Sequence, residues 1–186
     1  MHLLWLEPDQ IVAMIDYPPL HSPRALAAYY EAFCAGAPAV SPIPVLGQEL
    51  VLTAFRQQKR RFATYRQALQ AFLESHPAAA YWMLGGTHRA AAAMCAGKRI
   101  PCALIADDAD FAAFAPSGSG INLHGDYTTV LTPLTSVDEE LRILEAHYFE
   151  QRRFWTVAEK VQAMMARGDI PAAMREALGR EGGRGS

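Results

Sequence analysis

The stretch from residue 80 to residue 106 constrains the fold of this chain more than any other. It opens with the apolar run 81–84, which has the composition of a buried strand. A Gly-Gly turn follows, and the alanine-rich run 90–96 favours a helix. Gly97 is typical of a helix stop, and the apolar segment 100–106 predicts a second strand. The order strand, turn, helix, strand indicates an α/β protein.

The turn inside this unit predicts a site for an anion. Gly85 and Gly86 precede the expected helix, and the hydroxyl of Thr87 can cap its first turn. A helix N-terminus carries unpaired N–H groups and about half a positive charge, which together attract phosphate. His88 and Arg89 add side-chain donors at the same end. The alternative is a plain strand-to-helix connection with no ligand.

Composition limits the class of protein. A chain of 186 residues with 51% hydrophobic residues can build one substantial core. Its formal net charge of -2 gives no general attraction to nucleic acid. No apolar run is long enough for a membrane span, and the first residues lack the pattern of a secretion signal. The three cysteines are scattered in apolar surroundings, so we expect reduced core thiols in a cytoplasmic protein.

Hydrophobic periodicity and the residues that begin or end helices predict the remaining elements. Strands are expected at 2–6 and 43–46, either a strand or the end of a short helix at 11–15, and a helix at 23–35 after the Ser-Pro start. The C-terminal part predicts a helix that is capped by Ser136 with Glu139, and then helices at 156–166 and 171–178. The last two favour a packing or dimerisation hairpin over a DNA-reading unit, because no basic recognition helix follows.

Two charged segments each allow two interpretations. The periodic segment 48–75 predicts one long amphipathic helix, whose other face carries the basic residues Arg56, Lys59, Arg60, Arg61 and Arg66. That stripe either faces phosphates or a partner, or is simply solvated. The acidic cluster 107–110 either caps a short helix or binds a cation, and capping is favoured.

The run Trp82-Met-Leu-Gly-Gly-Thr-His-Arg-Ala-Ala-Ala-Ala, with the exit Gly97-Lys-Arg-Ile-Pro101, resembles the ParB/sulfiredoxin superfamily. The resemblance covers roughly residues 2–108. The loop 18–24 and the extended segment 41–45 fit it more weakly. It implies an α/β domain with a small mixed sheet, followed by C-terminal helices. It also implies that the Gly-x-His-Arg helix start holds nucleotide phosphates.

Family members differ in what they do with this site. Sulfiredoxins place a cysteine where this chain has Thr87, so sulfiredoxin activity is not expected here. Chromosome-partitioning members bind and hydrolyse CTP, and a kinase member phosphorylates free serine from ADP. We expect residues 1–135 to form the ParB-like domain, with an inserted helix at about 48–75. A helical extension at 136–180 and a disordered tail at 181–186 would follow.

These observations predict a nucleotide- or phosphate-binding protein with phosphoryl-transfer or nucleotide-hydrolysing capacity. The predicted catalytic residues are His88 and Asp16, and no metal ligands are assigned. The predicted phosphate-binding residues are Gly85, Gly86, Thr87, His88, Arg89 and Arg24. CTP, ATP or ADP would be the ligand, and Mg²⁺ a plausible companion ion. The alternatives are a DNA-binding, partitioning-like module and a protein-binding scaffold. The sequence also allows a homodimer.

Overall fold

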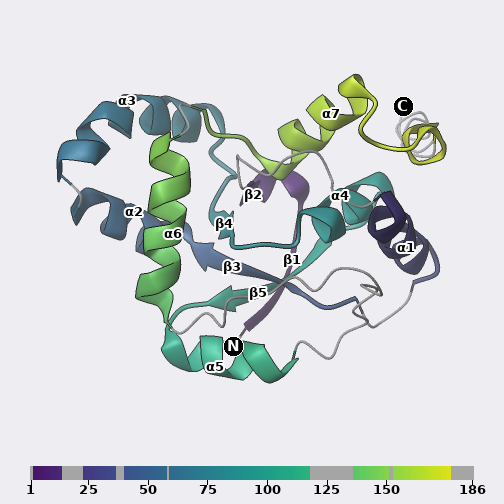
Figure 1. The fold of residues 1–186 in the computed structure, drawn as a ribbon, viewed down its shortest axis with the longest axis horizontal. Coiled ribbons are helices and arrows are strands. Elements are labelled where there is room, and N and C mark those ends of the chain that lie inside the picture. Colours follow the sequence, from purple (N-terminus) through teal and green to yellow (C-terminus); the bar gives the residue numbers. More distant parts are fainter. Residues whose placement is uncertain are drawn as a thin grey trace.

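A mixed five-stranded sheet with strand order β1-β5-β3-β4-β2 forms the centre of the protein (Figure 1). The computed structural model describes residues 2–13, 23–36, 40–57, 59–117, 136–150 and 153–176. The strands are β1 (His2–Leu6), β2 (Ile11–Val12), β3 (Ile43–Gly47), β4 (Tyr81–Met83) and β5 (Ile100–Ile105). β3 runs parallel to β5 and antiparallel to β4, while β1 lies antiparallel to β5 and β2 parallel to β4. The expected α/β class with a small mixed sheet is confirmed.

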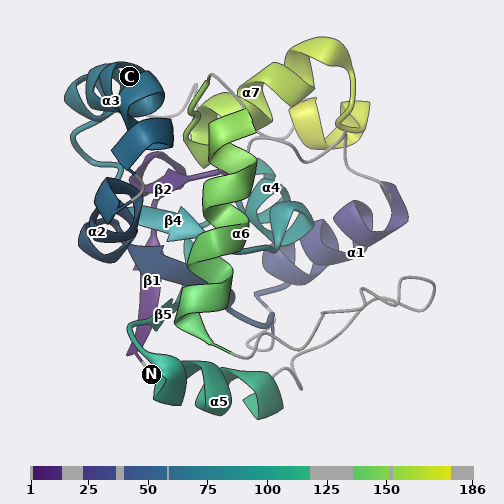
Figure 2. The same cartoon turned by 60° about the vertical axis from the view of Figure 1, so that its left-hand side comes forward.

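Helices cover both faces of this sheet. The first face carries α1 (Pro23–Cys34), α4 (Thr87–Cys95) and α7 (Val157–Arg167). The second carries α2 (Gln48–Gln57), α3 (Lys59–Ser75), α5 (Asp108–Ser117) and α6 (Val137–Glu150). Figure 2 shows α6 lying across the strands, with α1 and α4 on the other side. The pleat divides one strand between the two cores, since Ile100 and Cys102 of β5 join the first core and Ile105 joins the second.

The single long helix predicted for 48–75 is wrong, because two helices fill that stretch. Both face the second core, α2 through Val51 and Phe55, and α3 through Leu69 and Phe72. One straight helix of this length would run about 42 Å at 1.5 Å per residue. A five-stranded sheet is only about 24 Å wide, so such a helix could not keep both ends on it.

The helix-capping interpretation explains most of the acidic cluster. Asp107 Oδ1 accepts a hydrogen bond of 2.9 Å from the N–H of Asp110, and Asp108 Oδ1 accepts one of 2.7 Å from the N–H of Val137. Ser136 Oγ accepts the predicted capping bond from the N–H of Glu139 at 3.2 Å. The described residues contain no group of three or more His, Cys, Asp or Glu side chains that could hold a metal ion.

Other expectations have mixed outcomes. All three cysteines are free thiols, but Cys34 is exposed while Cys95 and Cys102 are buried. The domain boundary at 135 and the tail 181–186 lie outside the described residues. In the part of the chain that is described, no helix has the length and apolarity needed to cross a membrane.

Glu140 is a buried carboxyl in the first turn of α6, only 4% exposed. Burial, with a smaller contribution from Glu139, raises the pKa of Glu140 to about 7. The folded state therefore binds a proton that the unfolded chain has already lost between about pH 4.5 and pH 7. The contribution of Glu140 to the free energy of unfolding is therefore most favourable at low pH, and it is lost as the pH rises through the folded-state pKa.

We predict that Glu140→Gln removes this pH dependence. Relative to the parent protein, the variant should be little changed near pH 5 and stabilised by on the order of 2 kcal/mol near pH 8. Urea unfolding at the two pH values measures the difference. Asp138→Asn, an exposed position on the same helix turn, controls for the loss of a negative charge. An equal effect of Glu140→Gln at both pH values would contradict the prediction.

Candidate functional site

The turn before α4 has Gly86, not Thr87, at the cap position. Gly86 adopts φ 87° and ψ 27°, and its carbonyl accepts a 2.9 Å hydrogen bond from the N–H of Ala90. Thr87 is the first helical residue, so the expected capping by its hydroxyl is wrong. A Cβ at Gly86 would lie 2.9 Å from Cγ1 of Ile43. Glycine is therefore required both by the left-handed backbone and by the close approach to β3, and it offers the first N–H groups of α4 no side-chain acceptor.

Arg89 ties the start of α4 to the chain that enters β3. Its Nη1 donates hydrogen bonds to the carbonyl oxygens of Ser41 and Pro42, each at 2.8 Å. The β3–β5 register explains why the carbonyl of Ser41 needs a partner, because continuing the ladder would pair it with the N–H of residue 101. That residue is Pro101, which has no N–H. The guanidinium thus supplies the donor that the sheet lacks, which gives Arg89 a structural role beside the predicted contact with phosphate.

Burial shifts the pKa values of Arg89 and of two cysteines in the same core. Burial lowers the pKa of Arg89, and Tyr29 and Cys102 partly offset the shift. Burial also raises the pKa of the Cys102 thiol to about 12, although the positive charge of Arg89 opposes the change. It raises the pKa of Cys95 to about 11. Both thiols stay protonated near neutral pH and are poor nucleophiles.

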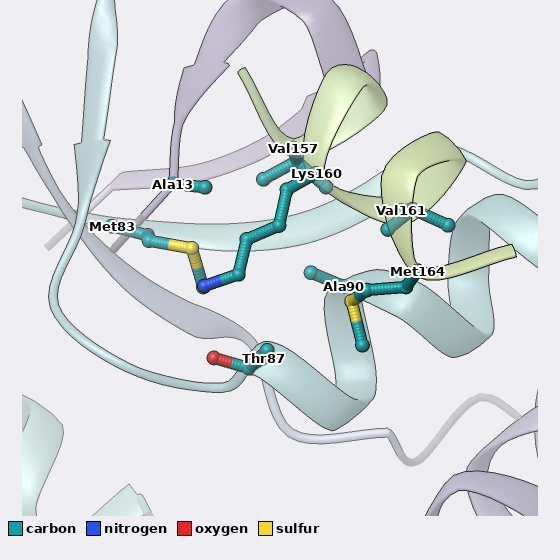
Figure 3. A pocket seen from close by; sticks show the side chains of 8 residues that line it. All are labelled: Ala13, Met83, Thr87, Ala90, Val157, Lys160, Val161 and Met164. Carbon is teal, nitrogen blue, oxygen red and sulfur yellow. The ribbon is translucent and has the colours of Figure 1, made fainter. Parts of the chain in front are cut away.

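A small pocket opens beside the N-terminus of α4 (Figure 3). It encloses about 10 Å³, roughly the room that one water molecule needs, and its lining is mostly apolar. The lining residues are Ala13, Met83, Thr87, Ala90, Val157, Lys160, Val161 and Met164. Figure 3 shows the Lys160 side chain reaching from α7 toward Met83 and the first turn of α4. An ammonium group is thereby brought to the positive end of a helix, in a wall whose other residues, apart from Thr87, are apolar.

The first turn of α7, which carries Lys160, is held by three sets of contacts. Thr156 and Glu159 form a reciprocal capping box, with N–H to side-chain bonds of 2.8 and 3.1 Å. The other carboxylate oxygen of Glu159 lies 3.2 Å from Nε2 of His76, which follows α3. The N–H of Ala13 donates to the carbonyl of Trp155 at 2.9 Å. These contacts come from α7 itself, from His76 and from Ala13, and together they place Lys160 opposite α4.

The structure brings together only part of the predicted site. Gly85, Gly86, Thr87, His88 and Arg89 form the turn and the first helical residues of α4, and all are half-buried. Arg24 is exposed in the first turn of α1, and Asp16 lies outside the described residues. Lys160 was not predicted, and no sequence signal marks it, because a single lysine in an amphipathic helix looks like any solvated residue.

Comparisons with protein-family models, with curated proteins and with solved structures gave no match for this chain.

Gly86 provides a direct test of the turn geometry. We predict that Gly86→Ala lowers the free energy of unfolding by about 1–3 kcal/mol, because the new Cβ meets Ile43 and φ is positive. Gly85→Ala is the matched control, since its Cβ would have no heavy atom within 4 Å and its φ is not positive. Urea unfolding curves measure both variants. Equal losses for the two glycines would show that the turn is not strained at Gly86.

Arg89 and Pro101 should be energetically coupled. We predict that Arg89→Met lowers the free energy of unfolding by about 2–4 kcal/mol, since two carbonyls lose their donor. In a Pro101→Ala background the new N–H can bond to Ser41, so the same substitution should cost less. A double-mutant cycle in urea measures the coupling. If the losses in free energy of unfolding from the two substitutions simply add, Arg89 does not stand in for the N–H that Pro101 lacks.

Proposed function

We propose that the first turn of α4 and Lys160 together bind a phosphate group. The observation that carries the proposal is the position of Lys160, which reaches from α7 to the pocket at the N-terminus of α4. The positive end of the α4 dipole and the ammonium group both attract an anion, and the apolar surroundings strengthen that attraction. An anion at the mouth of the pocket would be attracted by both.

The pocket is too small to enclose a nucleotide. Pockets for drug-sized ligands span about 300–1,000 Å³, and this one encloses only about 10 Å³. A terminal phosphate would bind at the mouth of the pocket, beside Thr87 and Lys160, and the rest of a nucleotide or phosphorylated metabolite would extend away from it. Thr87 lines the pocket, so its hydroxyl is a donor for the same phosphate.

We further propose that the chain is a divergent ParB/sulfiredoxin-like protein of the cytoplasm. The support for the family is the motif Gly86-Thr-His-Arg89 at a strand-to-helix turn of a small mixed sheet. Three free thiols support the location. CTP, ATP and ADP are the candidate ligands, and phosphoryl transfer or hydrolysis is the candidate reaction. His88, the second residue of α4, is the catalytic candidate that the described residues contain.

In such a reaction the residues of this chain would act mainly by position and charge. The first turn of α4 and Lys160 would hold the terminal phosphate and offset the negative charge that develops on it. His88 could move a proton, because histidine exchanges protons near neutral pH. The described residues provide no clustered ligand set for Mg²⁺, so we assign no step to a metal ion.

Calorimetric titration with inorganic phosphate, pyrophosphate, CTP, ATP and ADP tests the proposal. We predict that at least one of these ligands binds, and that Lys160→Met weakens the binding about tenfold or more through loss of a charge-assisted contact. Thr87→Val, which removes one hydroxyl, should weaken binding less.

Lys98→Met is the matched control for charge. Lys98 is exposed and follows the C-terminal end of α4, away from the pocket. The Lys98→Met substitution should leave binding almost unchanged, apart from a small general electrostatic effect that salt suppresses. The absence of heat with all five ligands would contradict the proposal, as would equal weakening by the Lys160 and Lys98 variants.

A further inference from the structure

His76, the residue that follows α3, contacts three oxygen atoms through its two ring nitrogens. Its Nδ1 lies 2.9 Å from the carbonyl oxygen of Phe72 and 2.9 Å from Oγ of Ser75. Its Nε2 lies 3.2 Å from Oε1 of Glu159, in the first turn of α7. The ring also stacks on the ring of Phe72, with the two centroids 4.5 Å apart, and this contact sets its orientation between the two helices.

All of these contacts are satisfied together only when both ring nitrogens carry a hydrogen. A carbonyl or carboxylate oxygen accepts hydrogen bonds and has no hydrogen to donate. The hydroxyl of Ser75 donates toward the carbonyls of Ala71 and Phe72, each at 2.9 Å, so its oxygen can accept from Nδ1. A neutral ring has a hydrogen on one nitrogen only, and a lone pair would then face either the carbonyl of Phe72 or the carboxylate of Glu159. The arrangement therefore favours the imidazolium form.

Glu159 is the charged group that the described contacts set against this ring. Its second oxygen, Oε2, is used inside the capping box of α7. Glu74, near the end of α3, accepts a hydrogen bond of 2.9 Å from Nε2 of Gln70. The short 3₁₀ helix Pro8–Gln10, which packs against α7, brings one carboxylate, the exposed Asp9. A single carboxylate thus joins the cap of α7 to the end of α3.

We propose that protonated His76 is a positioning residue for Lys160, a role that presupposes the proposed phosphate site. While both ring nitrogens carry a hydrogen, the ion pair with Glu159 ties the start of α7 to α3 and holds the ammonium group beside the N-terminus of α4. Loss of the second proton as the pH rises sets a lone pair against the carboxylate and releases this tie. The ligand must then order the lysine side chain itself, which weakens binding. The site therefore binds phosphate more tightly on the acid side of neutral pH.

The tie between α3 and α7 can be measured without a ligand. A double-mutant cycle of His76→Phe and Glu159→Gln in urea isolates the coupling between the two side chains. Phenylalanine keeps an aromatic ring against Phe72, and glutamine keeps an acceptor for the capping box. At pH 6 the coupling should favour the folded state about threefold, as for a partly exposed ion pair, and at pH 8 it should vanish or change sign. An equal coupling at the two pH values would overturn the proposal.

Calorimetric titration with inorganic phosphate at pH 6 and pH 8 tests the effect on the site. His76→Gln is the decisive variant, because its side-chain amide can donate to Glu159 at both pH values without carrying a charge. From pH 6 to pH 8 the affinity of the parent should fall about threefold more than that of His76→Gln, the same factor as the lost ion pair. Phosphate has the same ionisation for both proteins at a given pH, and both keep His88, so the comparison isolates His76. His76→Phe, which has no donor, should bind weakly at both pH values.

His2→Gln is the matched control for the loss of a histidine. His2 is exposed on β1, so its replacement should leave the pH dependence of the parent unchanged. A parent protein that binds phosphate with the same pH dependence as His76→Gln would overturn the role of His76 and leave the phosphate site intact. Absence of phosphate binding by the parent at both pH values would instead contradict the proposed function, and the role of His76 would fall with it.

Discussion

The hydrogen bonds from Arg89 to the carbonyls of Ser41 and Pro42 are the contacts on which the centre of this structure depends. They join the first turn of α4 to the segment that enters β3, the middle strand of the sheet. Pro101 removes the donor that β5 would have supplied there, so a side chain must replace it. A buried carbonyl without a donor is costly, which gives the guanidinium a clear energetic reason to lie in this position.

The same clamp fixes where the candidate ligand site can be. Gly86 lies against Ile43 and beside the guanidinium, which leaves no room for a Cβ. The first N–H groups of α4 are thus held at a defined place above the sheet. The alanines 90–93 that follow are fully buried and small, so α4 can pack closely on β5 and α1. A rigid helix start is what a preorganised anion site needs, because no reorganisation is then required on binding.

Local sequence patterns predicted most of the elements because each pattern acts over a few residues. The strands at 2–6 and 43–46, the Ser136 cap and the helix stop at Gly97 follow from pleat, capping and backbone freedom, and the structure has them. The prediction for 48–75 failed because the hydrophobic period of a segment carries no information about the width of the sheet that its helix must cover. The role of Thr87 as a cap failed because the approach of Ile43 made Gly86 the better cap residue.

The sequence by itself determined the strand–turn–helix–strand unit at 80–106, the α/β class and the candidate anion turn, since these depend on neighbouring residues. Only the tertiary structure decided which side chains meet at that turn. Arg89 faces two carbonyls because a proline lies in the adjacent strand, and Lys160 reaches the pocket because His76 and Ala13 help to hold the start of α7. Residues some 70 positions apart, such as Thr87 and Lys160, line one pocket because of packing, which leaves no local signal in the sequence.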